Sequence, residues 1–351
     1  MKVIHLVPAL EQGGVETVVC ELSRALVEKG WQSVVISKGG RLAARIDSSG
    51  GRHLTLDLKS KNPFTYFQRA FKLRALISKE KPDLVLAHSR VPAWLWVWAN
   101  RTLRIPWITY AHGANSVSRY SSVMTFGALT IVPSHFLADY LKKNYSLQEE
   151  RLRIINPSVD FERFDPHRLD IEFVETKKRE WGIKANDFVV MAVGRITPLK
   201  GYDTLIKMVK DYKCIIVGDA DEDHKEYLDY LKSIAGRNVV FAGGETKIPE
   251  CLSIANVLIS ANVRKPESFG LSMAEALAME VPVVAKAFGG ALDVVNDGDD
   301  GILVKSEDEF LAAIDKARTT KFIGLRERAM ARFNRELMIE NTIAAYREIV
   351  K

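Results

Sequence analysis

Two glutamates eight residues apart, Glu267 and Glu275 in ESFGLSMAE, frame the stretch with the strongest chemical signal. The apolar run after Phe269 predicts a buried helix that begins near this residue. Since an unpaired buried carboxylate is unfavourable, we expect Glu275 to face a polar cleft or a hydroxylated ligand. A helix start attracts anions through its free backbone N–H groups, which here belong to Ser268, Phe269, Gly270 and Leu271. The order of a carboxylate, an anion-binding helix start and a second carboxylate suits a ligand made of a sugar, a diphosphate and a ribose. The alternative is a core helix with one buried pair, which would show the same spacing.

A second candidate cluster lies in GRITPLKG, directly after a predicted strand at Phe188–Val193. Arg195 leaves the strand end and Lys200 follows about a turn later, so both cations can reach one anion. With Gly194 and the anion hole, they would clamp a diphosphate without a metal ion, because two cations supply the charge neutralisation that Mg²⁺ supplies elsewhere. Two surface cations on a loop are the simpler alternative.

The first half of the chain carries weaker signals. Gly13 and Gly14 follow a predicted strand, Val3–Pro8, and let the backbone approach a ligand, although a tight turn without a ligand is an equal alternative. The GxGxxG pattern of dinucleotide sites is absent from this turn. Ligands of parallel sheets bind at the carboxyl ends of strands, which is where His88, His112 and Ser134 fall. A lone histidine at a strand end is more often structural than catalytic.

The elements that must position these residues are strands that alternate with helices along the chain. This alternation predicts parallel sheets with helices on both faces. We predict two doubly wound, Rossmann-like α/β domains, at residues 1–165 and 185–333, that face each other across a deep cleft. Residues 166–184 are polar and charged and are predicted to form a linker. The last helix, 334–351, is amphipathic and is expected to cross back and pack at the domain junction.

Composition limits the class of protein. The chain has 351 residues, of which 47% are apolar and 27% charged, as in a globular protein with two ordinary domains. Its three cysteines are far apart and its seven histidines form no ligand cluster, so we expect no disulfide and no metal site. The N-terminal apolar run is too short for a signal peptide, and Val91–Ala99 is too short to span a bilayer. We therefore expect a cytoplasmic protein, free or peripheral to a membrane.

Charge is divided unevenly between the two halves. Residues 1–165 hold 23 Lys and Arg against 14 Asp and Glu, which points to an anionic partner for the first half. A basic amphipathic helix is predicted over Lys59–Lys81, with Phe64, Phe67 and Phe71 on one side. Its cations could rest on an anionic membrane, or they could form a solvated face over a packed core; they are Lys59, Lys61, Arg69, Lys72 and Arg74.

Taken together, these motifs resemble glycosyltransferase family 4, the large retaining family with the GT-B fold, over essentially the whole chain. The matching pieces are Gly13-Gly14-x-Glu16, Ala111-His112-Gly113, IINPSVD, VGRITPLKG, the E-x7-E motif from Glu267 to Glu275, and GGALDVVNDGDDGILV. The sequence departs from the family pattern at three turns. Glu280 stands where the family usually has glycine, Leu292-Asp293 replaces Pro-Glu, and Gly218-Asp219-Ala220 lacks a second glycine.

The resemblance implies a role for each matching residue. Arg195 and Lys200 would hold the donor diphosphate, Glu275 the ribose, and Glu267 the transferred sugar. The amides of Phe269, Gly270 and Leu271 would cradle phosphate, while Gly13 and Gly14 would approach donor and acceptor. His112 would lie beside the reacting face of the sugar.

The resemblance also implies the reaction: retaining transfer of a hexose from a nucleotide sugar, without a metal or other cofactor. The acceptor would be a saccharide or lipid-linked saccharide in lipopolysaccharide or surface-polysaccharide assembly, approached on the side of His88, Arg119 and Ser134. A nucleic-acid partner is not expected. A non-catalytic sugar- or nucleotide-binding module and a sugar-nucleotide epimerase of the same fold are the alternatives.

Overall fold

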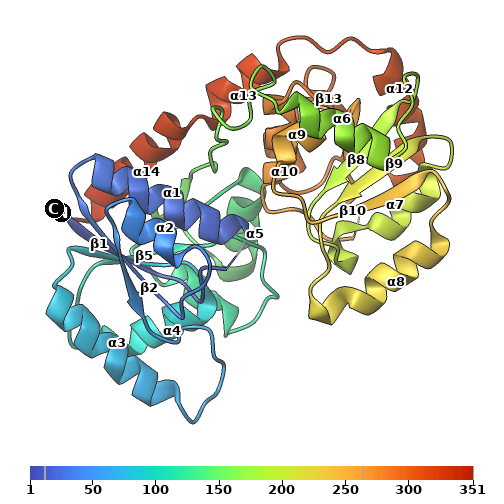
Figure 1. The fold of residues 1–351 in the computed structure, drawn as a ribbon. Helices are drawn as coiled ribbons and strands as arrows, with labels where there is room; N and C mark the ends of the chain where they lie inside the picture. The colour runs from blue at the N-terminus through green and yellow to red at the C-terminus, as the bar shows by residue number, and fades with distance from the viewer. Residues whose placement is uncertain (12, 263, 351) are drawn as a thin grey trace. The chain divides into compact units, whose positions relative to one another are not determined.

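The computed structural model describes residues 1–11, 13–262 and 264–350 and divides the chain into two compact units. Unit 1 holds residues 1–157 together with the C-terminal segment from Glu336, and unit 2 holds Ser158–Arg335. The division follows Pro157, earlier in the chain than the predicted boundary at 165. Figure 1 shows the helices and strands of each unit.

Unit 1 is built on a parallel sheet of seven strands in the order β3-β2-β1-β4-β5-β6-β7. The predicted strand at Val3–Pro8 is present as β1, whereas β3 has little sequence signal because it is short, RHLT, and has two exposed residues. The strands are β1 (Lys2–Leu6), β2 (Gln32–Ser37), β3 (Arg52–Thr55), β4 (Leu84–Ala87), β5 (Trp107–Tyr110), β6 (Leu129–Val132) and β7 (Leu152–Ile154).

Alternate residues of β1 face opposite layers of helices. Val3 packs with α1 and α14, whereas Ile4 and Leu6 pack with α3 and α4. The last helix therefore belongs to unit 1, so the chain crosses back to its first sheet, while the expected packing at the domain junction stays a prediction. The helices are α1 (Gly14–Glu28), α2 (Ala43–Ser48), α3 (Tyr66–Glu80), α4 (Arg90–Ala99), α5 (His135–Tyr145) and α14 (Arg335–Ile349), with the 3-10 turns η1 (Ser121–Thr125) and η2 (Glu149–Arg151).

Unit 2 repeats this architecture with six parallel strands in the order β10-β9-β8-β11-β12-β13. One face of the sheet packs on α6, α9, α10 and α13, and the other packs on α7, α8 and α12. The strands are β8 (Val189–Val193), β9 (Lys213–Val217), β10 (Val239–Gly243), β11 (Val257–Ser260), β12 (Val283–Lys286) and β13 (Gly301–Val304). The helices are α6 (Ile171–Glu180), α7 (Tyr202–Met208), α8 (Lys225–Ile234), α9 (Ile248–Leu252), α10 (Leu271–Ala278), α11 (Ala291–Val294), α12 (Phe310–Thr319) and α13 (Leu325–Phe333), with 3-10 turns η3 (Pro198–Lys200), η4 (Glu222–His224) and η5 (Glu307–Glu309).

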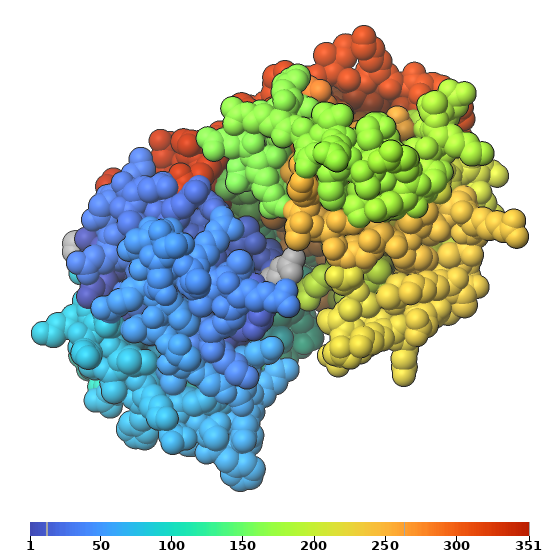
Figure 2. All heavy atoms as spheres, viewed as in Figure 1, coloured from blue at the N-terminus to red at the C-terminus, as the bar shows by residue number. Residues whose placement is uncertain are grey.

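Residues 166–184 do not form the predicted linker. They contain α6, whose Val174 is buried in the core of unit 2 next to Trp181. Most of the other residues of α6 are polar because the helix forms part of the outer surface of this unit (Figure 2). A helix that buries only one narrow stripe is mostly polar and charged, and this is why its composition resembles that of a linker.

The basic helix predicted over Lys59–Lys81 starts later than expected, and one of its predicted surface cations, Arg69, is buried. The helix begins at Tyr66, and residues 59–65 form a loop before it. Arg69 is only 5% exposed, and its guanidinium donates to the backbone oxygens of Asp57 and Asn62. Arg69 is thus removed from the predicted membrane-facing set, because its charge organises the loop.

Within the described residues, no helix combines the length and apolar character that crossing a bilayer requires.

Candidate functional site

The predicted site residues of unit 2 follow the strands at which the order of its sheet reverses. In a doubly wound sheet, ligands bind beside this reversal, outside the carboxyl ends of the two strands. Here the two strands are β8 and β11, which are neighbours. Gly194, Arg195 and Lys200 follow β8, and the loop with Glu267 follows β11.

Lys200 and Glu267 form an ion pair across this point, although they lie 67 residues apart in the sequence. Both side chains are about three-quarters buried, with exposed fractions of 25% and 23%. Gly194 makes the turn tight: its φ is +149°, and a Cβ there would lie 3.3 Å from both Cε of Lys200 and the hydroxyl of Tyr202. The Tyr202 hydroxyl donates to the Gly194 carbonyl at 3.0 Å, which fixes the turn.

Two consecutive glycines, Gly289 and Gly290, pack against the loop that contains Glu267. The N–H of Gly290 donates to the Glu267 carbonyl at 2.8 Å. A Cβ on Gly290 would lie 2.4–2.6 Å from backbone atoms of Phe269, although its φ of −64° suits any residue. The requirement for glycine at 290 is therefore one of space, and Gly289 similarly lies against Pro266.

The helix after this loop starts later than predicted, at Leu271 rather than near Phe269. Gly270 precedes it with a φ of +98°, and Phe269 is buried against Phe333 with ring centroids 5.4 Å apart. Among the described residues, the amides of Phe269, Gly270 and Leu271 donate no backbone–backbone hydrogen bond. The predicted anion-binding helix start is thus available, one turn beyond Glu267.

Glu275 lies half-buried in the middle of α10, and none of the described residues forms a hydrogen bond or ion pair with its carboxylate. Burial raises its pKa to about 7, opposed only in part by the charge of Arg163. Such an unpaired acid suits a ligand that donates hydroxyl hydrogens to it. Arg195 is exposed, and its guanidinium has no partner in the described part of the chain. The structure therefore joins Lys200 with Glu267 and leaves Arg195 and Glu275 without contacts to them.

In unit 1, three histidines form a hydrogen-bonded row at the carboxyl ends of β1, β4 and β5. Nδ1 of His5 lies 3.0 Å from Nε2 of His88, and Nδ1 of His88 lies 3.0 Å from Nε2 of His112. Tyr110 stacks on His112 with ring centroids 4.2 Å apart. Burial lowers the pKa of His5 and of His112 to about 3, and burial together with its two neighbours lowers that of His88 far below its usual value. All three rings are therefore neutral at pH 7.

The neutral row has a direction, because each imidazole then has one donor and one acceptor nitrogen. Nε2 of His5 is buried and has no partner among the described residues. A buried unpaired N–H is rarer than a buried unpaired acceptor. We therefore assign His5 as the first donor, which makes Nε2 of His112 an acceptor and places its proton on Nδ1. In this arrangement the Nδ1–H of His112 is a donor that a ligand could use, whereas both ring nitrogens of His88 are already used within the row.

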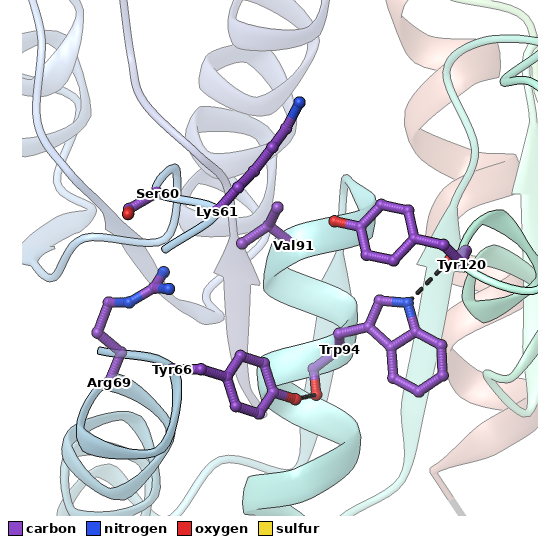
Figure 3. A pocket seen from close by; sticks show the side chains of 7 residues that line it. All are labelled: Ser60, Lys61, Tyr66, Arg69, Val91, Trp94 and Tyr120. Carbon is purple, nitrogen blue, oxygen red and sulfur yellow. Dashed lines mark hydrogen bonds between the residues drawn. The ribbon is translucent and has the colours of Figure 1, made fainter. Parts of the chain in front are cut away.

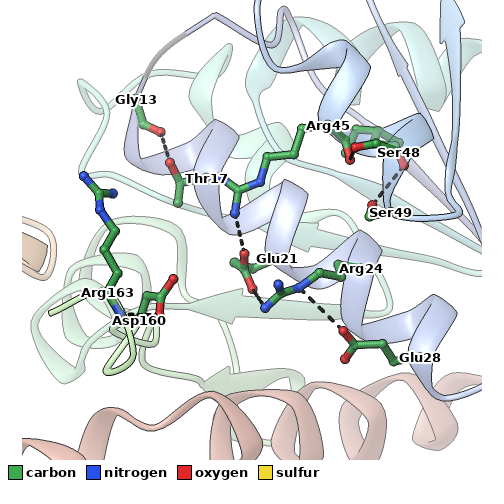
Figure 4. A network of polar contacts seen from close by, with 11 residues as sticks. Gly13, Thr17, Glu21, Arg24, Glu28, Arg45, Ser48, Ser49, Asp160 and Arg163 are labelled. Atoms are coloured by element: carbon green, nitrogen blue, oxygen red, sulfur yellow. Dashed lines mark hydrogen bonds and ion pairs between the residues drawn. The ribbon is translucent and has the colours of Figure 1, made fainter. Parts of the chain in front are cut away.

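The loop with Gly13 and Gly14 is held by α1. The hydroxyl of Thr17 donates to the Gly13 carbonyl at 3.0 Å, and Glu21 further along the helix pairs with Arg24 and Arg45 (Figure 4). The φ of Gly13, 168°, suits any residue, and a Cβ there would approach only the terminal carboxylate of Glu16, at 2.6 Å from Oε2. A Cβ on Gly14 would meet no described atom within 4 Å. The fold of this loop thus does not itself require glycine, so the predicted close approach of a ligand stays a prediction.

The other two residues predicted for the acceptor side differ in exposure. Ser134 is fully buried, and its hydroxyl accepts the N–H of Leu137 at 3.2 Å, so it caps α5. Arg119 is exposed and lies in the loop before η1. No group of three or more His, Cys, Asp or Glu side chains suited to a metal ion occurs within the described residues.

Two family models match the two units. The model described as glycosyl transferases group 1 matches residues 173–334, and the model described as glycosyltransferase family 4 matches residues 12–163. The chain belongs to the family 4 glycosyltransferases. The N-acetyl-alpha-D-glucosaminyl L-malate synthase of Bacillus anthracis is 24% identical over 84% of this chain and 81% of its own length. A D-inositol 3-phosphate glycosyltransferase of Salinispora arenicola is 28% identical over 52% of this chain, and the aligned part spans only 44% of that relative.

Solved structures identify the fold of this family 4 glycosyltransferase as GT-B. A crystal structure of a glycosyltransferase from Rickettsia africae matches with a TM-score of 0.89 and 27% identity, over 100% of this chain and 98% of that one. HepE of Anabaena, crystallised with UDP and glucose, matches with a TM-score of 0.85 and 19% identity, over 99% and 100% of the two chains. At this low identity the second likeness shows the fold.

The structure of the glycosyltransferase adds site residues that the sequence analysis did not single out. Gly290 was visible only as part of a longer motif, and its neighbour in space, Phe269, precedes it by 21 residues. His5 gave no signal because it lies inside an apolar strand. Only the register, which pairs His5 with Leu86, shows that its side chain shares a face with His88.

Proposed function

We propose that this glycosyltransferase transfers a hexose from a nucleoside diphosphate sugar to a saccharide or lipid-linked saccharide, with retention of the anomeric configuration. The observation that carries the proposal is the Lys200–Glu267 ion pair, which lies beside the open start of α10 at the strand reversal of unit 2. HepE, which shares the fold, was crystallised with UDP-glucose, and this supports the same donor class.

The difficult step of such a transfer is the departure of the nucleoside diphosphate. Negative charge grows on the leaving phosphate, so preorganised cations and N–H donors lower the barrier most. Lys200 is held in place by Glu267, and the amides of Phe269 to Leu271 follow Glu267 by about one turn of chain, so we propose that both act on the leaving phosphate. Arg195 is exposed and free to turn toward the same phosphate. We propose that these groups replace a metal ion, so that a chelator leaves turnover unchanged.

The two glutamates would recognise hydroxyl groups on either side of the diphosphate. Glu267 would bind the transferred sugar while it keeps Lys200 in place. Glu275 would bind the ribose, because a half-buried carboxylate with a raised pKa gains most from hydroxyl donors. Retention would follow from attack on the face that the diphosphate leaves, with the leaving phosphate accepting the acceptor's proton. His112, neutral and an N–H donor at Nδ1, would hydrogen-bond the sugar.

We further propose a membrane-associated acceptor of the lipopolysaccharide or surface-polysaccharide kind, at the cytoplasmic face of the membrane. Two features of unit 1 support this proposal: its excess of basic residues, and the ridge formed by Phe64, Phe67 and Phe71. These rings are 94%, 57% and 57% exposed, and the neighbouring Lys59, Lys61 and Lys72 are exposed as well. Arg74 is half-buried.

The experiment that tests the proposed function has two stages. Titration calorimetry against UDP, GDP and ADP would identify the base that binds, and incubation of the matching nucleotide sugar with candidate acceptors would follow. Proton NMR of the product distinguishes an α from a β linkage. Absence of binding to all three nucleotides, or inversion at the anomeric carbon, would overturn the proposal.

A further inference from the structure

Unit 1 contains a hollow that none of the site residues above explains. Its volume is about 480 Å³, within the roughly 300–1,000 Å³ range typical of small-molecule sites. It opens between the loop after β3, the first turns of α3 and α4, and the segment before η1 (Figure 3). Its lining consists of Ser60, Lys61, Tyr66, Arg69, Val91, Trp94 and Tyr120.

One wall of the hollow is a fixed aromatic surface. The hydroxyl of Tyr66 donates to the carbonyl of Trp94 at 2.8 Å, and the indole N–H of Trp94 donates to the carbonyl of Tyr120 at 2.8 Å. The rings of Trp94 and Tyr120 stack within 16° of parallel, at a centroid distance of 6.4 Å. Because the polar atoms of Tyr66 and Trp94 are used by the backbone, these two residues offer mainly ring surface. The electron-rich face of an aromatic ring attracts the polarised C–H groups of a pyranose.

The opposite wall carries positive charge without a carboxylate among the lining residues. Arg69 is 5% exposed and donates to Thr65 Oγ1 at 3.2 Å and to the carbonyls of Asp57 and Asn62 at 3.3 and 3.1 Å. All three acceptors are neutral, and they use three of the five N–H groups of a guanidinium. Two N–H groups of a nearly buried cation thus remain without a partner among the described residues.

Two further cations, Lys61 and Arg90, lie at or beside the hollow. Lys61 lines it and has no partner among the residues described, and on the aromatic side the guanidinium of Arg90 lies 5.4 Å above the Tyr120 ring. The acid nearest in the chain, Asp57, already accepts the backbone N–H groups of Lys59 and Ser60. An anionic group between Arg69 and Lys61 would therefore meet N–H donors and positive charge, with no carboxylate among the lining residues.

We infer that this hollow binds a sugar residue that carries a negative charge, either a carboxylate or a phosphate group. The pyranose would lie on Trp94 and Tyr120, while its anionic group meets Lys61 and the free N–H groups of Arg69. A neutral sugar would leave the cations without a partner, and a bare anion would leave the aromatic wall unused. The inference rests on the proposed function in one respect: the charged sugar would be part of the acceptor.

The test uses the whole chain and follows the indole N–H resonance of Trp94 by NMR, assigned with the variant Trp94→Phe. The probes are glucuronic acid and glucose 6-phosphate, with glucose and inorganic phosphate as the matched neutral and sugar-free compounds. We expect both charged sugars to shift this resonance and to bind at least about tenfold more tightly than glucose or phosphate. Lys61→Gln should weaken the charged sugars at least about fivefold without affecting glucose. Lys79→Gln, an exposed lysine near the end of α3 and outside the hollow, should leave the affinities for all four compounds unchanged.

Equal affinity for glucose and the charged sugars would overturn the inference, and so would equal affinity for phosphate and glucose 6-phosphate. An unchanged response in Lys61→Gln would do the same. The titrations are repeated with UDP present. A protein that binds the charged sugars at Trp94 but binds no nucleotide would contradict the proposed function alone, so the two failures are distinguishable.

Discussion

Nδ1 of His88 lies 3.0 Å from Nε2 of His112, and His88 is itself bonded to His5, so the ring that is predicted to contact the sugar is oriented by the other two rings of the row. In a row of three neutral imidazoles the hydrogen bonds can run in either direction, because each ring has one donor and one acceptor nitrogen. The unpaired Nε2 of His5 gives the row its direction.

The histidine row predicts that unit 1 loses stability as the pH falls. The pKa of His5 and of His112 is about 3 in the folded chain but about 6.5 in the unfolded one. Between these values the unfolded chain binds more protons, so the free energy of unfolding rises with pH and is highest above about 6.5. His5→Phe should reduce the proton uptake on unfolding at pH 5 by about one proton, as measured by denaturant titration across pH. An unchanged pH slope would show that the row is not neutral.

Lys200→Ala should reduce turnover by on the order of a hundredfold or more, because it removes the preorganised charge at the leaving phosphate. Glu267→Gln keeps the lysine but releases its ammonium from the ion pair, so we expect a smaller loss in turnover and weaker discrimination between donor sugars. Lys207→Ala, on the exposed side of α7, is the matched control and should be close to the parent protein. Steady-state kinetics with the donor found by calorimetry measures all three. Normal turnover in Lys200→Ala would remove this residue from the mechanism.

Glu275→Gln should raise the stability of unit 2 at high pH and at the same time lower the affinity for the nucleotide. Because the folded pKa is about 7 and the unfolded one about 4.3, the folded chain binds more protons in between, and this group destabilises unit 2 as the pH rises to about 7. The variant should therefore melt at a higher temperature at pH 8 and at an unchanged temperature below about pH 4.5. Its nucleotide affinity should fall by about 1.5–3 kcal/mol, the value of a hydrogen bond to a charged group.

Calorimetry of the parent protein gives a second measure of the same carboxylate. Nucleotide affinity should increase from pH 6 to pH 8, since the ribose hydroxyls bind the ionised form. Glu226→Gln, in the exposed face of α8, serves as the control and should follow the parent curve. A parent affinity that is independent of pH would count against the ribose contact.

Glu280→Gly should stabilise unit 2. Glu280 has a φ of +60°, directly after α10, where the family pattern has glycine. A side chain in this region costs about 1–2 kcal/mol, and the greater backbone entropy of glycine in the unfolded chain offsets about 0.5–1 of this. We expect a net gain of roughly 0.5–1 kcal/mol in the free energy of unfolding, measured by denaturant titration. A loss of stability would show that the exposed Glu280 side chain makes a compensating interaction.

The phenylalanine ridge predicts binding to anionic vesicles. Phe64→Ser should weaken cosedimentation with vesicles that contain anionic lipid, and so should reversing the charges of Lys59, Lys61 and Lys72, since apolar burial and charge attraction add. Val117→Ser, another exposed apolar residue of unit 1, is the control. Vesicle binding that survives both changes would place the membrane contact elsewhere or exclude it.

The sequence alone determined the architecture and the main chemical groups. Apolar strands alternating with amphipathic helices allow only parallel sheets covered on both faces, and this local pattern does not depend on distant contacts. The spacing of Glu267 and Glu275, and the cations after β8, could likewise be read directly. The polar composition of 166–184 gave the wrong result, because the side chains that bury α6 are only a small part of its surface.

Only the tertiary structure decided which groups meet. Lys200 reaches Glu267 because β8 and β11 are neighbours in the sheet, a relation that depends on strand order and not on distance along the chain. The row from His5 to His112 depends on register, since a shift of one residue would turn His5 to the opposite face. Arg69 was expected at the surface from its charge, whereas the path of the loop before α3 makes it a buried donor. Such pairings arise from the packing of whole elements, which no local pattern encodes.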